Sequence, residues 1–159
     1  MTVIFPHIDD ENLLPFLAPF SRMMFGYGRA MAALREVALT VLGDEDKAVR
    51  FMLKVKSTTM VEKFRELCAP TFEQDQLHAL LGHITTLTDL YRRRNMIVHG
   101  EWWFNVFEGG VLLVRDWDRD EGGPVHDETV TPESLDQLAR EFDDVSSDID
   151  MFSYKPNTG

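Results

Sequence analysis

Residues 71–100 read TFEQDQLHALLGHITTLTDLYRRRNMIVHG, and the spacing of their apolar side chains decides the fold. Apolar residues recur there at steps of three and four, which is the period of an amphipathic α-helix. Thr71 and Gln74 are spaced as a capping pair at its start, and Gly100 suits its end. One long helix is therefore predicted, with an apolar face formed by Leu77, Leu80, Leu81, Ile84, Leu87, Tyr91 and Val98.

Another amphipathic helix, of about six turns, is predicted upstream from residue 20 to Gly43, where the glycine supplies a stop. Pro6, Pro15 and Pro19 interrupt the residues before it, which predicts an irregular N-terminal arm over residues 1–19. The apolar positions of this helix recur at steps of three and four. They are Phe20, Met23, Met24, Tyr27, Met31, Leu34, Ala38 and Val41.

Two shorter helices are predicted between these long ones, around residues 49–55 and 60–67, the latter ending before Pro70. After Gly100 the pattern changes to two short β-prone runs around Glu108-Gly109-Gly110, which predicts a hairpin over residues 102–117. The acidic stretch 118–128 is predicted to be a loop. Thr131-Pro132-Glu133 then opens a last helix, whose apolar face contains Leu135, Leu138, Phe142, Val145, Ile149 and Phe152.

The predicted fold class is therefore mainly α, a helical bundle of about five helices with an appended β-hairpin. We expect one domain over residues 20–152, including the hairpin, followed by a tail at residues 153–159. A chain of 159 residues with 44% hydrophobic residues is the usual size of a single domain and can bury a core without crosslinks.

The composition excludes several classes of protein. Cys68 is the only cysteine, so an intramolecular disulfide is impossible and no Cys/His set for a structural zinc ion is present. The N-terminus lacks the basic region of a signal peptide, and no run approaches the roughly 20 apolar residues of a membrane span. We therefore expect a cytoplasmic protein that uses no metal and no cofactor.

The formal net charge of −11 is concentrated in the C-terminal part of the chain. Residues 116–150 hold 13 acidic residues against Arg119 and Arg140, and the rest of the chain is neutral overall. The part that contains Arg92, Arg93 and Arg94 is therefore not repelled from phosphate by its own composition. The acidic part is either a solvated face or an internal mimic of phosphate.

The end of the predicted long helix places polar side chains in or beside its apolar face. With about 100° per residue and Ile84 as the centre of that face, Asn95 lies within about 40° of the centre and His99 about 60° away. Arg94 lies about 80° away on the opposite flank, and Arg93 points outward. Because polar groups in an apolar face either find hydrogen-bond partners or line a cleft, we predict a partly buried polar pocket. In the alternative interpretation, Asn95 and His99 are satisfied core or cap residues.

The stretch Arg94-Asn95-Met96-Ile97-Val98-His99 resembles the signature of HEPN domains, an Arg followed by a polar residue, often Asn, and then by a His near the end of a helix. The resemblance covers roughly residues 20–100 and the last helix, and the HEPN fold, a bundle of about five helices, agrees with the predicted one. It implies a metal-independent endoribonuclease, commonly a toxin or defence effector. It also implies a homodimer in which two motifs face one cleft.

By this resemblance, Arg94, Asn95 and His99 are the catalytic residues. His99 would move a proton between the RNA 2′-OH and the leaving 5′-oxygen, and Arg94 would hold the phosphate as it gains charge. Arg92, Arg93 and Trp102 are the expected substrate-binding residues. For Trp102, stacking on a base is weighed against ordinary packing in the hairpin.

Two observations keep the function open. In the HEPN branch whose partner is a nucleotidyltransferase antitoxin, the Tyr two positions after the His is the modified residue, and this chain has Glu101 there. That difference argues against regulation by AMP transfer. Non-catalytic members of the family also exist, so the alternative function is a dimeric binding or assembly module that holds a nucleotide or a protein partner, such as an antitoxin or a regulatory protein.

Overall fold

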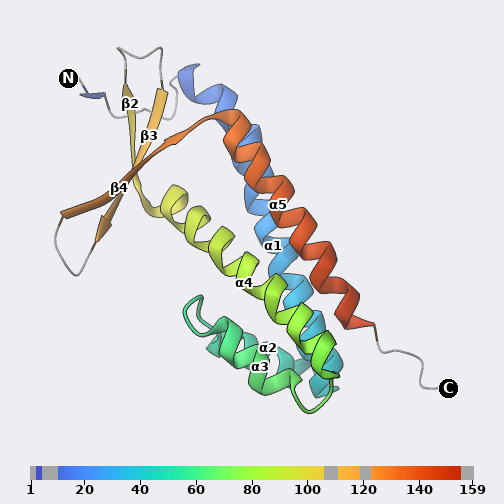
Figure 1. The fold of residues 1–159 in the computed structure, drawn as a ribbon. Coiled ribbons are helices and arrows are strands. Elements are labelled where there is room, and N and C mark those ends of the chain that lie inside the picture. The colour runs from blue at the N-terminus through green and yellow to red at the C-terminus, as the bar shows by residue number, and fades with distance from the viewer. Residues whose placement is uncertain (1–2, 5–10, 106–110, 119–122, 155–159) are drawn as a thin grey trace.

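The computed structural model describes residues 3–4, 11–105, 111–118 and 123–154. Its described part confirms a mainly α bundle with a small appended sheet (Figure 1). The five α-helices are α1 (Leu14–Leu42), α2 (Glu45–Lys54), α3 (Met60–Cys68), α4 (Gln74–His99) and α5 (Pro132–Asp150). The strands are β1 (Val3–Ile4), β2 (Glu101–Asn105), β3 (Val111–Asp118) and β4 (Gly123–Val130).

Helices α1 and α5 lie side by side along most of their length, and α4 packs against them (Figure 1). Helices α2 and α3 contact α1 and α4 at the end of the bundle far from the sheet. The apolar faces predicted from the helical spacing meet in one core. Its fully buried large side chains include Met23, Leu34, Phe64, Leu80, Ile84, Leu87, Leu135, Phe142 and Ile149.

The predicted irregular arm over residues 1–19 is wrong at its C-terminal end, because α1 begins at Leu14 and is preceded by a short 3-10 helix, Glu11–Leu13. Pro15 lies in the first turn, where a missing backbone N–H costs no helical hydrogen bond. Pro19 lies inside the helix. Phe16 and Pro19 are nevertheless buried, since they continue the apolar face of α1 by one more turn.

The helix ends follow local capping chemistry. Gly43 ends α1 with a positive φ of 67°, as its position in the sequence predicts, and the Asp44 side chain accepts a hydrogen bond from Lys47 N at the start of α2. The predicted capping pair Thr71–Gln74 is wrong by two residues. Helix α4 begins at Gln74, and Gln76 Oε1 accepts from Glu73 N.

The sheet is larger than the predicted hairpin. Four antiparallel strands pair in the order β1-β2-β3-β4, and Trp102 pairs with Val114 in the expected hairpin. The predicted loop over residues 118–128 is wrong, because β4 occupies Gly123–Val130 and pairs with β3. Glycine, proline and acidic residues in that stretch favour a turn locally, but pairing with β3 satisfies the backbone hydrogen bonds of the strand.

Gly100 joins α4 to β2 and lies very close to β3. A Cβ atom at this position would lie 2.5 Å from Met96 O and 2.5 Å from Val114 Cγ1. Gly100 ends α4, as predicted, but with an extended backbone and a φ of −74°. The glycine is therefore needed for the close approach of the sheet to the helix end.

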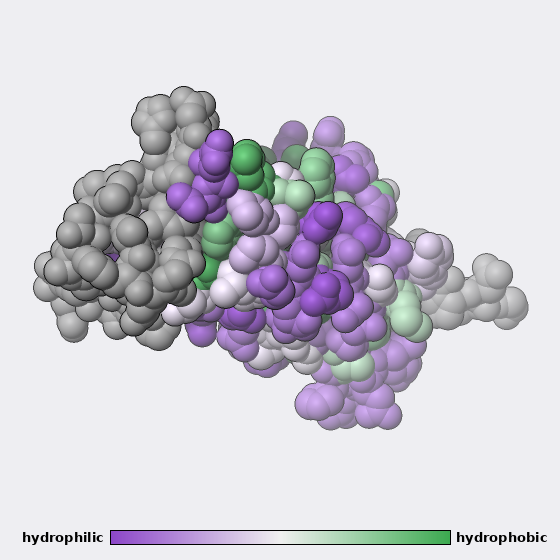
Figure 2. All heavy atoms as spheres, turned by 90° about the horizontal axis from the view of Figure 1, so that it is seen from above, coloured by the Kyte–Doolittle hydropathy of each residue, from purple (hydrophilic) through white to green (hydrophobic). Residues whose placement is uncertain are grey.

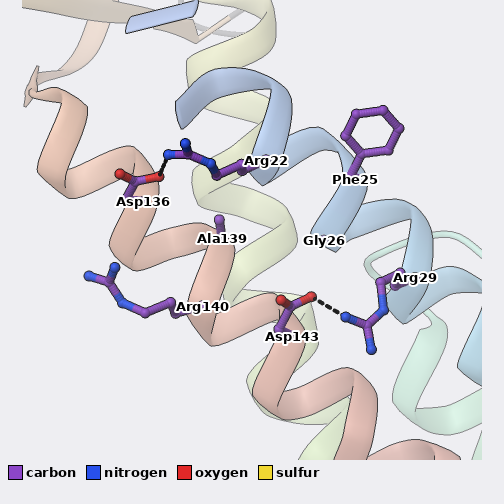
Figure 3. Close-up of a pocket in the computed structure, with 8 residues that line it drawn as sticks. All are labelled: Arg22, Phe25, Gly26, Arg29, Asp136, Ala139, Arg140 and Asp143. Atoms are coloured by element: carbon purple, nitrogen blue, oxygen red, sulfur yellow. Dashed lines mark hydrogen bonds and ion pairs between the residues drawn. The ribbon is translucent and has the colours of Figure 1, made fainter. Parts of the chain in front are cut away.

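The described surface is mostly hydrophilic when seen from the end that carries the sheet, with hydrophobic residues gathered in a smaller area (Figure 2). Two ion pairs, Arg22–Asp136 at 2.8 Å and Arg29–Asp143 at 2.9 Å, link α1 to α5 on the outside of the bundle (Figure 3). None of the described helices combines the length and apolar composition that a membrane span requires.

Candidate functional site

Arg94 is held in a half-buried position between α4 and α1. Its guanidinium carbon lies 4.5 Å from the centre of the Tyr27 ring, a cation–π contact. One terminal nitrogen donates to Asn95 Oδ1 at 2.9 Å, and the other donates to the Met24 sulfur at 3.6 Å, which is a weak acceptor. The Nε–H group is buried and has no hydrogen-bond partner in the described residues. The Arg94 side chain is thus held in place, but its hydrogen-bond donors are only partly paired.

Tyr27 contacts Arg94 through its ring and packs in turn against Tyr91. Their ring centres lie 5.5 Å apart, and the Tyr27 ring also contacts that of Phe142. Burial raises the pKa of the Tyr27 hydroxyl, Tyr91 raises it further, and Arg94 opposes the rise. Tyr27 is therefore a neutral phenol at pH 7. It holds Arg94 through the face of its ring.

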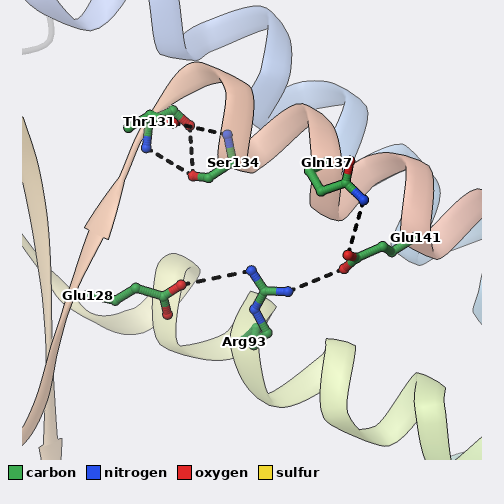
Figure 4. A network of polar contacts seen from close by, with 6 residues as sticks. All are labelled: Arg93, Glu128, Thr131, Ser134, Gln137 and Glu141. Carbon is green, nitrogen blue, oxygen red and sulfur yellow. Dashed lines mark hydrogen bonds and ion pairs between the residues drawn. The ribbon is translucent and has the colours of Figure 1, made fainter.

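Arg93 does not point outward as the helical geometry predicts. Its guanidinium lies 3.2 Å from Glu141 Oε2 on α5 and 3.9 Å from Glu128 Oε1 on β4 (Figure 4). Glu141 also accepts a hydrogen bond from Gln137. Helical spacing fixes only the direction in which the side chain leaves the backbone, and the long side chain of Arg93 turns toward the carboxylates that the bundle places beside it.

Arg92 is the most exposed of the three arginines, and it forms an ion pair with Asp89 one turn earlier, at 3.6 Å. Arg92 and Arg93 therefore each have a carboxylate partner. Arg94 has none among the described residues. This difference matters because an arginine without a carboxylate is the one most readily used for an anionic ligand.

His99 is exposed at the last position of α4 and forms no hydrogen bond or ion pair within the described part of the chain. Asn95 lies one turn before it, but its Oδ1 atom accepts from Arg94 rather than from His99. His99 lies five positions after Arg94, which places it about 140° around the helix. The structure therefore brings Arg94 and Asn95 together and places His99 on the other flank of α4.

Trp102 is half-buried beside the end of α4. Its indole N–H donates to Ile97 O at 2.6 Å, and its ring packs edge-on against Phe20 with centres 5.8 Å apart. These contacts match the packing interpretation of Trp102. The residue also lines an apolar groove of about 320 Å³, together with Leu13, Phe16, Leu17, Phe20, Ile97 and Val98.

Other reactive groups contribute little to the site. Cys68 is buried on α3, as expected for a small core residue, and burial raises the pKa of its thiol to about 12, so it remains protonated at neutral pH. The described residues contain no group of three or more His, Cys, Asp or Glu side chains that could hold a metal ion.

Sequence reasoning missed Met24 and Tyr27 as partners of Arg94. Met24 and Tyr27 come from α1, and only the packing of α1 on α4 brings them to the guanidinium. Comparisons of the chain with models of known families, with characterised proteins and with solved structures find no match.

Proposed function

We propose that this protein is a metal-independent endoribonuclease of the HEPN type, with Arg94, Asn95 and His99 as its catalytic residues. One observation carries the proposal. Of the three consecutive arginines, Arg94 alone has no carboxylate partner among the described residues, and it is held by an aromatic ring and an amide instead. A fixed guanidinium with unsatisfied N–H groups suits a phosphate that gains charge in a transition state.

The reaction needs one proton removed and one proton supplied. The 2′-oxygen of the RNA attacks the adjacent phosphorus as its proton leaves to a base, and the bond from phosphorus to the 5′-oxygen breaks as that oxygen receives a proton. The products are a 2′,3′-cyclic phosphate and a 5′-hydroxyl. His99 suits either transfer, because an imidazole can accept a proton on one ring nitrogen and, when protonated, donate one, and this side chain is open to solvent.

The placement of these residues favours a site built from two chains. Within one chain His99 lies on the other flank of α4 from Arg94, and one imidazole cannot act as base and acid in the same step. A homodimer whose two α4 ends face one cleft supplies two imidazoles and two guanidinium groups. We therefore include the homodimer in the proposal.

The test is cleavage of single-stranded and structured RNA by the purified protein in excess EDTA. We expect activity to persist in EDTA, and His99→Ala to lower it by roughly 10²-fold or more with RNA binding nearly unchanged. His78→Ala is the matched control, because His78 is also an exposed histidine of α4 and lies about four turns before the motif. Undiminished cleavage by both His99→Ala and Arg94→Ala would remove the motif from the mechanism.

A second candidate function is a non-catalytic module that binds a nucleotide or a protein partner. The observation that favours it is the pairing of Arg93 with Glu128 and Glu141, because carboxylates of the acidic segment already occupy one cation beside the motif. In that case the protein would bind a nucleotide or RNA through Arg94 without cleaving it. Binding that Arg94→Ala abolishes, together with no cleavage, would favour this function over the nuclease.

A further inference from the structure

Helix α1 carries an exposed face without charged residues. Its large members, Leu14, Leu17 and Phe25, are 62%, 53% and 74% exposed. Arg22 and Arg29, which border this face, turn away from it toward Asp136 and Asp143 on α5, whereas Phe25 points away from α5 (Figure 3). The Ser21 hydroxyl donates a hydrogen bond to Leu17 O within the helix, so its donor is already paired. We call this face the α1 stripe; it consists of Leu14, Leu17, Ala18, Ser21, Phe25, Gly28 and Ala32.

Gly28 lies in the middle of this stripe, and the single chain gives no reason for it. A Cβ atom at Gly28 would meet no atom of the described residues within 4 Å. A glycine in the interior of a helix lowers helix stability relative to alanine. Alanine would fit at this position without a clash. The glycine is explained if another backbone or a large side chain approaches it closely.

The order of large and small residues in the stripe is self-complementary. If a second α1 runs antiparallel across a two-fold axis at the level of Met23, Leu14 faces Ala32 of the other copy, and Ser21 faces Phe25. Ala18 and the neighbouring Leu17 then face the helical turn at Gly28, which has no side chain. Large side chains thus meet small ones at each step, over roughly 27 Å of helix. Such a match is required of an isologous contact and not of a contact with an unrelated protein.

We propose that the α1 stripe is the interface of a two-fold symmetric dimer of this chain, with the two α1 helices antiparallel. The apolar members supply the buried area and the small members let the helices approach, while Arg22 and Arg29 at the border stay paired with Asp136 and Asp143. The interface rests on these packing features and does not depend on the nuclease activity.

The same geometry bears on the candidate site, and this consequence does rest on the proposed function. Met24 lies next to the level of the axis, on the border of the stripe, and its sulfur contacts the Arg94 guanidinium at 3.6 Å. The dimer therefore places the two Arg94 side chains, one from each copy, near the two-fold axis. Loss of the Phe25 packing would separate the two Arg94 side chains without changing any residue of the motif.

The first test is the association state, measured by sedimentation velocity from about 1 to 100 μM. We expect the wild type to dimerise, and Phe25→Asp or Gly28→Leu to raise the dissociation constant by about tenfold or more. The matched controls are Leu53→Asp, at a leucine of α2 that is 81% exposed, and Gly82→Leu, at a glycine of α4 that also has open space around it in the described structure. Both should dimerise like the wild type, with unchanged circular dichroism in all four variants.

The second test is the register of the two helices. Leu14→Cys and Ala32→Cys proteins, mixed under mild oxidation, should form a disulfide-linked dimer, whereas neither should crosslink alone, because equivalent positions lie far apart in an antiparallel pair. A crosslink of Leu14→Cys with itself would overturn the antiparallel arrangement. A wild type that stays monomeric at 100 μM, or a Phe25→Asp variant that dimerises normally, would overturn the interface, whether or not RNA is cleaved.

Discussion

Substitution of Gly100 by alanine tests the joint between α4 and the sheet. The new methyl group would lie 2.5 Å from Met96 O, 2.5 Å from Val114 Cγ1 and 2.9 Å from Arg115 O, all shorter than any ordinary carbon contact. Two of the three atoms belong to the backbone and cannot move by a change of rotamer. The helix end and β3 must therefore separate.

Overpacking of this kind costs about 2 to 3 kcal/mol, which in a chain of this length lowers the midpoint of thermal unfolding by about 4 to 12 °C. Gly82→Ala is the matched control on the same helix, where an added Cβ meets nothing among the described residues. It should stabilise the protein by roughly 0.5 to 1 kcal/mol. The two substitutions are chemically identical and are expected to have opposite signs.

The assay is unfolding by urea and by heat, followed by circular dichroism, for the wild type and the two variants. Because Gly100 directly follows His99, we also expect Gly100→Ala to impair RNA cleavage at temperatures where the variant is fully folded. A Gly100→Ala protein within about 0.5 kcal/mol of the wild type would refute the steric argument. Equal destabilisation by both substitutions would refute it as well, since the change would then reflect helix propensity and not the contact with β3.

Arg94→Lys should lower cleavage by roughly 10²-fold, because an ammonium group keeps the charge but lacks the planar pair of donors, and Arg92→Lys should have little effect in the same assay. Glu141→Gln should raise RNA affinity at low salt by releasing Arg93, and the gain should disappear at high salt; an unchanged affinity would mean that this ion pair does not restrict the site. Burial raises the pKa of the Cys68 thiol from 9.0 to about 12 in the folded state. The thiol therefore loses its proton at a lower pH in the unfolded chain than in the folded one. Stability should therefore fall as the pH rises above about 9, with a shallower fall in Cys68→Ala measured by urea unfolding at each pH.

The sequence by itself determined the parts of the fold that depend on local spacing. Apolar residues at steps of three and four specified all five helices, Gly43 ended α1, and Thr131 with Pro132 opened α5. The β-prone runs after Gly100 specified β2 and β3. These features are readable because period, capping and turn chemistry act between residues that are near one another in the chain.

Only the tertiary structure decided that residues 123–130 form a strand and which partners the charged side chains contact. Strand β4 forms because β3 offers it a pairing edge, although its own residues favour a turn. Arg93 meets Glu128 and Glu141, and Arg94 meets Tyr27, because packing brings α5, β4 and α1 to α4 from distant parts of the sequence. One sequence pattern, three arginines in a row, thus becomes three different electrostatic environments, since the partner of a long charged side chain is set by whichever element packs beside it.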